Sequence, residues 1–357
     1  MARRKTIGIL TGGGDCPGLN AVIRAAARTA IRDYDLDVLG IQLGFEGLMT
    51  GSTIPLTSES IRGILPKGGT LLRTTNRGNP FEFPNEKGEK EDRSAAVMNT
   101  VERLGIDGII AIGGDGTLKI AQRLADKGLP IVAVPKTIDN DLAATDYTFG
   151  FMTAVAVATD AVDRLHTTAE SHDRVMILEV MGRNCGWIAL YSGLAGGADI
   201  ILIPEIAYKP EHIVNSIRER QSEGSQFDII VVAEGAKRDG GEESYLDKAS
   251  RRLGGIAYQV AADIAQHIEL EIRVTVLGHI QRGGSPIAFD RILATRFGKA
   301  AADLVARGEF GRMVAYREEK IISVAIRDAI SKPKRVNPDG EMVATARSLG
   351  ISFGDGR

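Results

Sequence analysis

Short apolar segments alternate with stretches of helical periodicity along most of this chain. From Phe151 to Leu165, apolar residues recur in steps of three and four, which is the period of one helix face. A second helix is predicted from about Leu19 to Arg32. The apolar segments that read as strands occupy residues 7–10, 107–112, 130–134, 174–180, 199–203, 228–233 and 272–277. Because strands that alternate with helices build βαβ units, we predict an α/β fold with mainly parallel sheets.

Length and composition narrow the class of protein. A chain of 357 residues is long for one small domain and suits two lobes. Its net charge of -2 argues against a nucleic-acid binder, which normally carries a strongly basic domain. The two cysteines, Cys16 and Cys185, are too few for a disulfide framework and are expected to be small packed residues. No apolar run approaches the ~20 residues of a membrane span, so we expect a cytoplasmic protein.

Two Gly-rich segments follow predicted strands. Glycine makes up 42 of 357 residues, roughly 12% against a usual ~7%, and many of these glycines stand at strand ends. The segment 11–20 reads TGGGDCPGLN, which is typical either of a phosphate-binding turn or of a plain tight turn. The segment 112–117 reads IGGDGT. There, Asp115 could reach a magnesium ion that bridges phosphates, and Gly116 leaves room for a nucleotide; the alternative is that Asp115 caps the next helix.

An acidic turn follows the apolar run at 130–134. Its sequence, PKTIDND at 135–141, places Asp139 and Asp141 two residues apart. One carboxylate can face a metal ion while the other accepts a proton from a substrate hydroxyl as general base. Lys136 and Thr137 add hydrogen-bond donors to the same turn. A purely structural turn remains the alternative, since Asp and Asn are common in turns.

The second half of the chain supplies groups that bind anions. His279 and Arg282 follow an apolar strand within VLGHIQRGGSP at 276–286, and arginine matches phosphate oxygens bidentately. Arg174 and Arg273 each stand at the beginning of a strand, where a solvated strand end is an equal alternative. Other strands end at Met181-Gly182-Arg183 and at Glu234, whose polar groups could hold sugar hydroxyls.

Together these segments closely resemble the bacterial-type 6-phosphofructokinase family, from about Lys5 to the region of Tyr316. The segments TDYTFGF at 145–151 and EVMGRNCGW at 179–187 add to those quoted above. The resemblance implies two doubly wound lobes with the active site in the cleft between them, and a homotetramer. It suggests that residues 1–150 with 281–331 form the phosphoryl-donor lobe and residues 151–280 the sugar-phosphate lobe. The role of residues 332–357 is left open.

The resemblance also implies roles for single residues. Asp139 would be the general base for the 1-hydroxyl of fructose 6-phosphate, and Arg183 would neutralise charge on the transferred phosphoryl group. ATP and Mg²⁺ would be held by Gly14, Arg77, Asp115, Gly116, Thr117, Lys136 and the second metal-linked carboxylate, Asp141. The sugar would be contacted by Thr137, Met181, Gly182 and Glu234. Its 6-phosphate would be bound by His279 and Arg282, with Arg174 and Arg273 reaching across from a neighbouring subunit.

The chain departs from the family pattern at two places. Arg73 stands where the family usually has glycine, and the spacing to Arg77 is one residue longer than in common bacterial members. The allosteric site is the second departure. Arg24, Arg28 and Lys67 match cations that bind effectors in regulated members, whereas positions that are mostly basic there are occupied by His166, Glu223, Ser225 and Phe227. We therefore expect weak or altered control by anionic effectors.

The phosphoryl donor is open between ATP and pyrophosphate. Members of the family that use pyrophosphate typically carry Asp at the position of Gly116 and Lys at the position of Lys136, so this chain has one mark of each kind. A carboxylate at position 116 would repel the α-phosphate of a nucleotide, which favours ATP here. Two other classes of protein are possible: a non-catalytic regulatory subunit, and a NAD or lipid kinase that shares the Gly-Gly-Asp-Gly loop. The retained carboxylates argue against the first, and the segment at 276–286 argues against the second.

Overall fold

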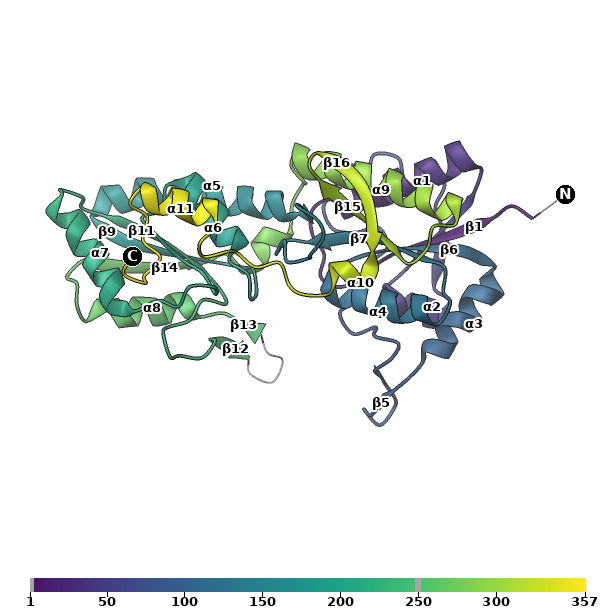
Figure 1. The fold of residues 1–357 in the computed structure, drawn as a ribbon, viewed down its shortest axis with the longest axis horizontal. Helices are drawn as coiled ribbons and strands as arrows, with labels where there is room; N and C mark the ends of the chain where they lie inside the picture. Colours follow the sequence, from purple (N-terminus) through teal and green to yellow (C-terminus); the bar gives the residue numbers. More distant parts are fainter. Residues whose placement is uncertain (1–2, 248–251) are drawn as a thin grey trace. The chain divides into compact units, whose positions relative to one another are not determined.

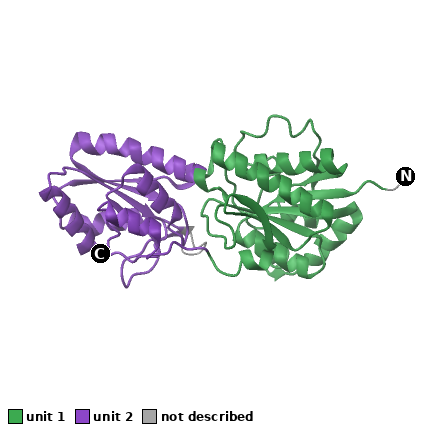
Figure 2. Cartoon of the chain, turned by 45° about the horizontal axis from the view of Figure 1, so that its top comes forward, with its two compact units in different colours: residues 1–152, 282–333 green, residues 153–281, 334–357 purple. Residues whose placement is uncertain are grey.

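The computed structural model describes residues 3–247 and 252–357 (Figure 1). The chain divides into two compact units, which are coloured separately in Figure 2. Unit 1 contains residues 1–152 and 282–333, and unit 2 contains residues 153–281 and 334–357. Each unit has a sheet of its own with helices packed on it.

Unit 1 is built on an eight-stranded sheet in the order β16-β15-β7-β6-β1-β2-β3, with β8 paired to β7. The inner pairs are parallel, and only the pairs β2–β3 and β15–β16 are antiparallel within this sheet. The strands are β1 (Thr6–Thr11), β2 (Asp37–Ile41), β3 (Thr53–Pro55), β6 (Ile106–Gly113), β7 (Ile131–Thr137), β8 (Phe149–Gly150), β15 (Arg312–Arg317) and β16 (Lys320–Ala325). The central strands β6 and β7 are almost entirely buried, as their continuous apolar sequences predict.

The helices of unit 1 are α1 (Leu19–Tyr34), α2 (Phe45–Thr50), α3 (Ser94–Leu104), α4 (Asp115–Asp126), α9 (Ala288–Arg307) and α10 (Ile326–Ala329). Helices α1 and α9 pack very closely, because Gly298 has no side chain: a Cβ there would lie 2.5 Å from the carbonyl oxygen of Val22. The polar stretch 76–93 carries a short hairpin of β4 (Phe83–Pro84) and β5 (Lys90–Glu91).

Unit 2 contains a four-stranded parallel sheet in the order β10-β11-β9-β14. Its strands are β9 (Arg174–Val180), β10 (Ile200–Leu202), β11 (Asp228–Ala233) and β14 (Glu271–Val276), and a separate antiparallel pair is formed by β12 (Tyr245–Asp247) and β13 (Arg252–Leu253). The helices are α5 (Phe151–His172), α6 (Trp187–Gly196), α7 (Pro210–Ser222), α8 (Ile256–Ala265), the 3₁₀ helix η1 (Gly278–Arg282) and α11 (Glu341–Ser348). The predicted α/β fold with mainly parallel sheets is confirmed.

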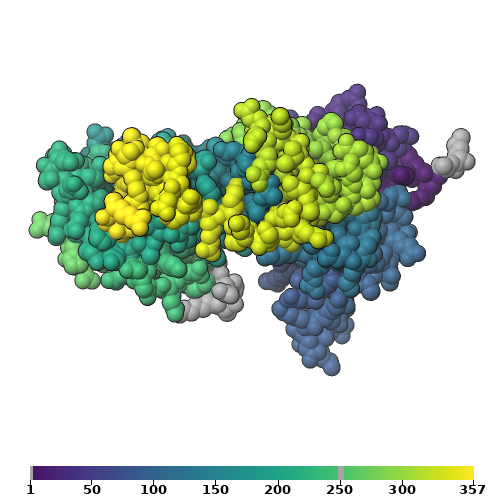
Figure 3. Space-filling model, in the orientation of Figure 1, coloured from purple at the N-terminus to yellow at the C-terminus, as the bar shows by residue number. Residues whose placement is uncertain are grey.

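The C-terminal segment 334–357 belongs to unit 2 and covers part of its surface (Figure 3). Ser352 forms a parallel bridge with Ile200 at the open edge of β10, and its carbonyl accepts a hydrogen bond of 2.9 Å from the N–H of Ile201. Ile351 and Phe353 are buried beside it. This segment is therefore a covering element that satisfies an exposed sheet edge.

The fold contains no candidate for a membrane span, because no helix in residues 3–247 and 252–357 is both long and apolar enough to cross a bilayer. Cys16 and Cys185 are both buried, as their expected role as packed residues requires. Burial raises the pKa of the Cys16 thiol to about 12, so this thiol stays protonated at neutral pH.

Candidate active site

The Gly-rich turn after β1 lies directly against the start of α4 in unit 1. A Cβ on Gly12 would come within 2.7 Å of Thr117 Oγ1, and one on Gly113 within 2.3 Å of Thr117 Cβ. The N–H of Gly12 donates to the carbonyl oxygen of Ile112 at 2.9 Å. Glycine is thus required on both strands for this close approach, and the structure brings the two Gly-rich segments of the sequence together.

The N-terminus of α4 is open to an anion. Gly114 is its N-cap and offers no side chain, and the first hydrogen bond of the helix runs from the N–H of Leu118 to the carbonyl of Gly114 at 3.0 Å. The N–H groups of the first turn therefore point out of the helix, where its dipole favours negative charge. The N-cap residue is Gly114 and not Asp115, so the alternative that Asp115 caps the helix is wrong; its carboxylate instead forms an ion pair of 2.7 Å with Lys119.

Two cationic side chains surround the backbone of Gly14. The buried Lys136 donates a hydrogen bond to the carbonyl oxygen of Gly14. Arg282 donates to the carbonyl oxygen of Asp15 at 3.2 Å, and a Cβ on Gly14 would lie 3.0 Å from Arg282 Nη1. Burial lowers the pKa of Lys136 from its ordinary value, and Arg282 adds to this shift while Cys16 opposes it. The Gly-rich turn therefore has concentrated positive charge at its end, which suits a phosphate chain.

The acidic turn after β7 is held by its own hydrogen bonds. The N–H of Asp139 donates to Thr137 Oγ1 at 3.0 Å, and Thr148 donates from its hydroxyl to the carbonyl of Thr137 at 2.8 Å and from its N–H to Asn140 Oδ1 at 3.1 Å. Asn140 adopts a left-handed φ of 50°. Asp139 is only 5% exposed, whereas Asp141 is half-buried, so the two carboxylates lie in different environments as predicted.

One oxygen of Asp139 is left without a donor. Its Oδ1 is buried and has no hydrogen-bond partner among the described residues. A buried acceptor without a partner costs roughly 1–3 kcal/mol, more when it is charged, and native proteins retain such groups mainly where they serve a function. A substrate hydroxyl is the kind of donor that this oxygen lacks.

The carboxylates of unit 1 fit a magnesium ion shared with a substrate. No group of three or more His, Cys, Asp or Glu side chains that could hold a metal occurs in the described part of the chain. Mg²⁺ is commonly bound by only one or two carboxylates together with substrate phosphates. Asp115, beside an anion-binding helix end, provides oxygen of the required kind.

Arg73 and Arg77 lie beside the same Gly-rich turn. Arg73 has a left-handed φ of 57°, and its carbonyl oxygen accepts a hydrogen bond of 2.9 Å from Thr11 Oγ1. Glycine adopts this backbone conformation without strain, whereas arginine does so at a cost. Thr74 ties the segment to the turn by donating to the carbonyl of Gly13 at 2.6 Å. Both arginine side chains are exposed and accessible to a ligand.

In unit 2, the ends of β9 and β11 bring four predicted residues together. The N–H of Arg183 donates to Glu234 Oε1 at 3.0 Å, and the N–H of Glu234 donates to the carbonyl of Val180 at 2.8 Å. Gly182 has a φ of 140° and Arg183 a left-handed φ of 50°. Met181, Gly182, Arg183 and Glu234 therefore form one polar loop cluster at the carboxyl edge of this sheet.

Arg174 begins β9, and Arg273 is the third residue of β14, in register with Met176 of β9. Both arginines form ion pairs with the carboxylate of Glu271, and β9 begins at Arg174, six residues before Val180. At a rise of ~3.3 Å per residue, the length of β9 separates Arg174 from Val180 by about 20 Å. His279, in η1 after β14, is at the carboxyl edge and exposed. The structure therefore does not bring these two arginines to the loop cluster of their own chain.

The positions that differ from regulated relatives make contacts within unit 2. The ring of His166 packs edge-on against Phe227 with centroids 5.9 Å apart, and His166 Nε2 forms a hydrogen bond of 2.8 Å with the carbonyl of Gly196. Ser225 accepts a hydrogen bond of 3.3 Å from Arg220. Weak control by anionic effectors stays a prediction.

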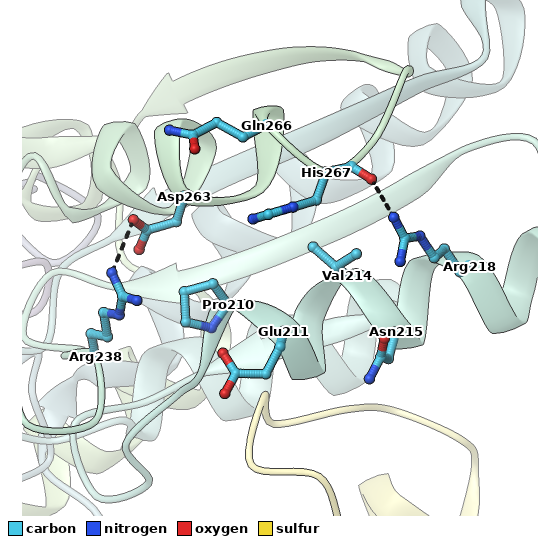
Figure 4. A pocket seen from close by; sticks show the side chains of 9 residues that line it. All are labelled: Pro210, Glu211, Val214, Asn215, Arg218, Arg238, Asp263, Gln266 and His267. Carbon is cyan, nitrogen blue, oxygen red and sulfur yellow. Dashed lines mark hydrogen bonds and ion pairs between the residues drawn. The ribbon is translucent and has the colours of Figure 1, made fainter.

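A cavity of about 300 Å³ lies between α7 and α8 in unit 2 (Figure 4). Arg238 at its rim pairs with Asp263 at 3.5 Å, and Arg218 donates to the carbonyl oxygen of His267 at 2.8 Å. None of the residues that line it is one of the predicted site residues. Its arginines are already engaged, so this cavity offers no site like the one in unit 1.

Known proteins similar to this chain extend over nearly its whole length. It is 52% identical over 355 residues to an ATP-dependent 6-phosphofructokinase of Chloroflexus aurantiacus, with 99% of each chain covered. It is 50% identical over 354 residues to a pyrophosphate–fructose 6-phosphate 1-phosphotransferase of Streptomyces coelicolor, with 98% of this chain and 99% of the other covered.

Among solved structures, the chain resembles phosphofructokinase from Saccharomyces cerevisiae with a TM-score of 0.79 and 32% identity. That match covers 99% of this chain but 48% of the yeast chain. The family model described as phosphofructokinase matches residues 6–305. The Gly-rich turn, the acidic turn and the loop cluster all lie within that range, and the chain belongs to the phosphofructokinase family.

Proposed function

We propose that this protein transfers the γ-phosphoryl group of ATP to the 1-hydroxyl of fructose 6-phosphate, giving fructose 1,6-bisphosphate and ADP. The observation that carries the proposal is the buried oxygen of Asp139, which has no hydrogen-bond partner among the described residues. Asp139 follows β7, and the neighbouring strand β6 ends just before the anion-binding start of α4. A general base next to a phosphate site is the arrangement that a sugar kinase requires.

In this mechanism Asp139 accepts the proton of the 1-hydroxyl as the sugar oxygen attacks the γ-phosphorus, and the bond from that phosphorus to the β,γ-bridging oxygen breaks. Thr137 orients the acidic turn, since its hydroxyl accepts the N–H of Asp139. Lys136, Thr117 and the N–H groups of α4 bind the phosphate chain of the donor. Arg183 stabilises the charge that develops on the transferred group. Electrostatic stabilisation of this kind is usually the largest catalytic contribution in phosphoryl transfer.

Asp115 and Asp141 are the residues that would hold Mg²⁺. When bound, this ion neutralises the phosphate charge and so lowers the barrier to attack by the sugar oxygen. Gly14, Arg77 and Gly116 make up the rest of the donor site in this proposal.

The sugar phosphate is bound by residues of two subunits in this proposal. Met181, Gly182 and Glu234 contact the sugar, and His279 and Arg282 bind its 6-phosphate. The separation of Arg174 from Met181 along β9 supports a role for Arg174 and Arg273 in the site of a neighbouring chain. A homo-oligomer, a tetramer by analogy with the family, is therefore part of the proposal, as is a cytoplasmic location for this glycolytic reaction.

ATP is favoured over pyrophosphate by the surroundings of Gly116. A Cβ at this position would meet no atom within 4 Å, so the space above the first turn of α4 is open. The N–H groups there can approach a nucleotide without an opposing carboxylate. Pyrophosphate remains the second candidate donor, because the similar Streptomyces coelicolor protein bears the name of a pyrophosphate-dependent enzyme.

The test is a coupled assay that offers ATP and pyrophosphate in parallel to the purified protein with fructose 6-phosphate and Mg²⁺. We expect fructose 1,6-bisphosphate to form with ATP at a kcat/KM at least tenfold above that with pyrophosphate. A preference for pyrophosphate would overturn the donor, and no product with either donor would favour a non-catalytic regulatory subunit.

A further inference from the structure

The loop that carries Arg183 is fixed at both of its ends. At its beginning, Glu234 accepts the N–H of Arg183, as described above. At its end, the N–H of Gly186 donates to both carboxylate oxygens of Glu205, at 3.1 Å each. Gly186 is also the N-cap of α6 and has no side chain of its own to satisfy the helix start. Glu205 thus holds the point at which the Arg183 loop becomes a helix.

Glu205 is itself held by the C-terminal segment. The N–H of Val336 donates to Glu205 Oε1 at 2.9 Å. One residue after Gly186, the indole N–H of Trp187 donates to the carbonyl oxygen of Lys334 at 2.8 Å. The family model ends at residue 305, so Val336, which bonds this carboxylate, and Lys334, which bonds Trp187, both lie outside it. Three residues of this segment therefore span the end of the Arg183 loop.

The backbone of the Arg183 loop is closely packed and has little room to move. A Cβ on Gly186 would lie 2.4 Å from Ile203 Cβ and 2.8 Å from Glu205 Oε2, and one on Gly235 would lie 2.0 Å from the carbonyl oxygen of Arg183. Arg183 itself adopts a left-handed φ of 50°. For a residue other than glycine this conformation is strained and persists only where the surroundings enforce it.

Burial raises the pKa of Glu205 from its ordinary value, and hydrogen bonds from the N–H groups of Val336 and Gly186 oppose that rise. The carboxylate therefore accepts hydrogen bonds from two backbone segments, at Gly186 and at Val336, and joins them.

We propose that Glu205 is a positioning residue for Arg183. Its carboxylate, anchored by Val336, fixes the end of the 181–186 loop so that the guanidinium of Arg183 is preorganised for the transferred phosphoryl group. This inference rests on the proposed function. A charge-stabilising group must be held within about 0.5 Å of its productive position, so loosening its support lowers turnover more than binding.

The test combines Glu205→Gln with Arg183→Ala in a double-mutant cycle. Alone, Glu205→Gln loses the acceptor for one of the paired hydrogen bonds while keeping the shape of the side chain. We expect kcat to fall by about 10- to 100-fold, with KM for fructose 6-phosphate and ATP within about twofold. In the Arg183→Ala background the same change should lower kcat by less than about twofold, because its effect passes through the guanidinium.

Two further variants separate positioning from general stability. Trp187→Phe removes the indole N–H but keeps an aromatic ring, and should lower kcat in the same direction by a smaller factor. Arg347→Ala breaks the ion pair of 2.7 Å with Asp355 within the same C-terminal segment. This control should lower the melting temperature but leave kcat unchanged.

Equal losses of kcat from Glu205→Gln with and without Arg183 would overturn the proposal, as would a rise in KM at constant kcat. Amide hydrogen exchange supplies a readout that does not depend on turnover. The N–H groups of Gly186 and Val336 should exchange faster in Glu205→Gln, and unchanged exchange would show that the carboxylate does not hold the loop. A wild-type protein that is inactive with both donors, yet shows faster exchange in the variant, would instead contradict the proposed function alone.

Discussion

The buried ammonium group of Lys136 donates its hydrogen bond to the backbone carbonyl oxygen of Gly14. Lys136 is only 3% exposed, and its pKa is lowered from the ordinary value chiefly by burial. A neutral carbonyl compensates a buried cation less well than an anion does. The geometry therefore leaves Lys136 with an unmet attraction for negative charge at the Gly-rich turn.

Replacing this cation should weaken use of the phosphoryl donor. We expect Lys136→Met to lower kcat/KM for ATP by about 10- to 100-fold, while KM for fructose 6-phosphate changes little. Steady-state kinetics with each substrate varied in turn would measure both effects. The surface variant Lys127→Met is the matched control and should behave as wild type; a loss confined to fructose 6-phosphate binding would contradict the assignment of Lys136 to the donor.

Asp139 should be essential for turnover and dispensable for binding. Asp139→Asn keeps the size of the side chain but cannot accept the proton of the sugar hydroxyl, so kcat should fall by ~10² to 10⁴. KM for fructose 6-phosphate should stay within a few fold, as measured by initial rates over a range of sugar phosphate concentrations. Turnover near the wild-type value would move the role of general base to another residue.

Gly116 should determine the choice of donor. Gly116→Asp introduces a carboxylate where a Cβ meets no atom within 4 Å, so the protein should fold normally and repel the α-phosphate of ATP. We expect kcat/KM for ATP to fall by at least about tenfold and activity with pyrophosphate to be less affected. Gly116→Ala adds volume without charge, and so separates steric hindrance from charge repulsion. If Gly116→Ala lowers ATP activity as much as Gly116→Asp does, the loss is caused by volume and not by charge.

Active sites shared between subunits should be recoverable by mixing two inactive proteins. Arg174 stands at the amino end of β9 and Met181 directly after its carboxyl end. One chain therefore cannot place both residues at the same active site. Arg174→Ala and Asp139→Ala should each be nearly inactive alone, and hybrid oligomers should regain part of the activity. Subunit exchange is verified with differently tagged chains. Exchanged hybrids without activity would show that each site is built from one chain.

The stability of unit 2 should respond to pH through Asp228. Its carboxyl group is fully buried at the start of β11, where Arg220 donates to it at 2.8 Å. Burial raises its pKa to about 6, with the nearby charge of Asp199 adding to the rise and Arg220 opposing it. An unfolded Asp titrates near ~3.9. Between these two pH values Asp228 is protonated in the folded state but ionised in the unfolded state. The free energy of unfolding therefore decreases as the pH rises through this range.

Asp228→Asn cannot ionise and should lack this loss. The melting temperature of the variant minus that of the wild type should therefore increase from pH 4 to pH 7. The corresponding change in the difference between their free energies of unfolding is about 1–3 kcal/mol. Thermal unfolding followed by circular dichroism measures it, with the exposed Asp160→Asn as the control that should show no such trend. A difference independent of pH would mean that Asp228 stays ionised throughout.

The elements that bind phosphate could be recognised in the sequence because their signals are local. A buried strand followed by glycines, or by PKTIDND, is visible within ten residues, and the period of apolar positions identifies the helices that follow. The helix predicted from Leu19 to Arg32 extends in the structure to Tyr34, a difference typical of helix ends. These segments also carried the resemblance that the family match bears out.

Contacts between distant segments were decided only by the tertiary structure. Spacing in the sequence did not reveal that Lys136 reaches Gly14, or that Val336 anchors Glu205, because such pairs depend on which strands become neighbours and where the chain returns. The C-terminal segment shows this most clearly. The sequence left the role of residues 332–357 open, because the hydrogen bonds that they make to the edge of β10 exist only once that edge has been formed.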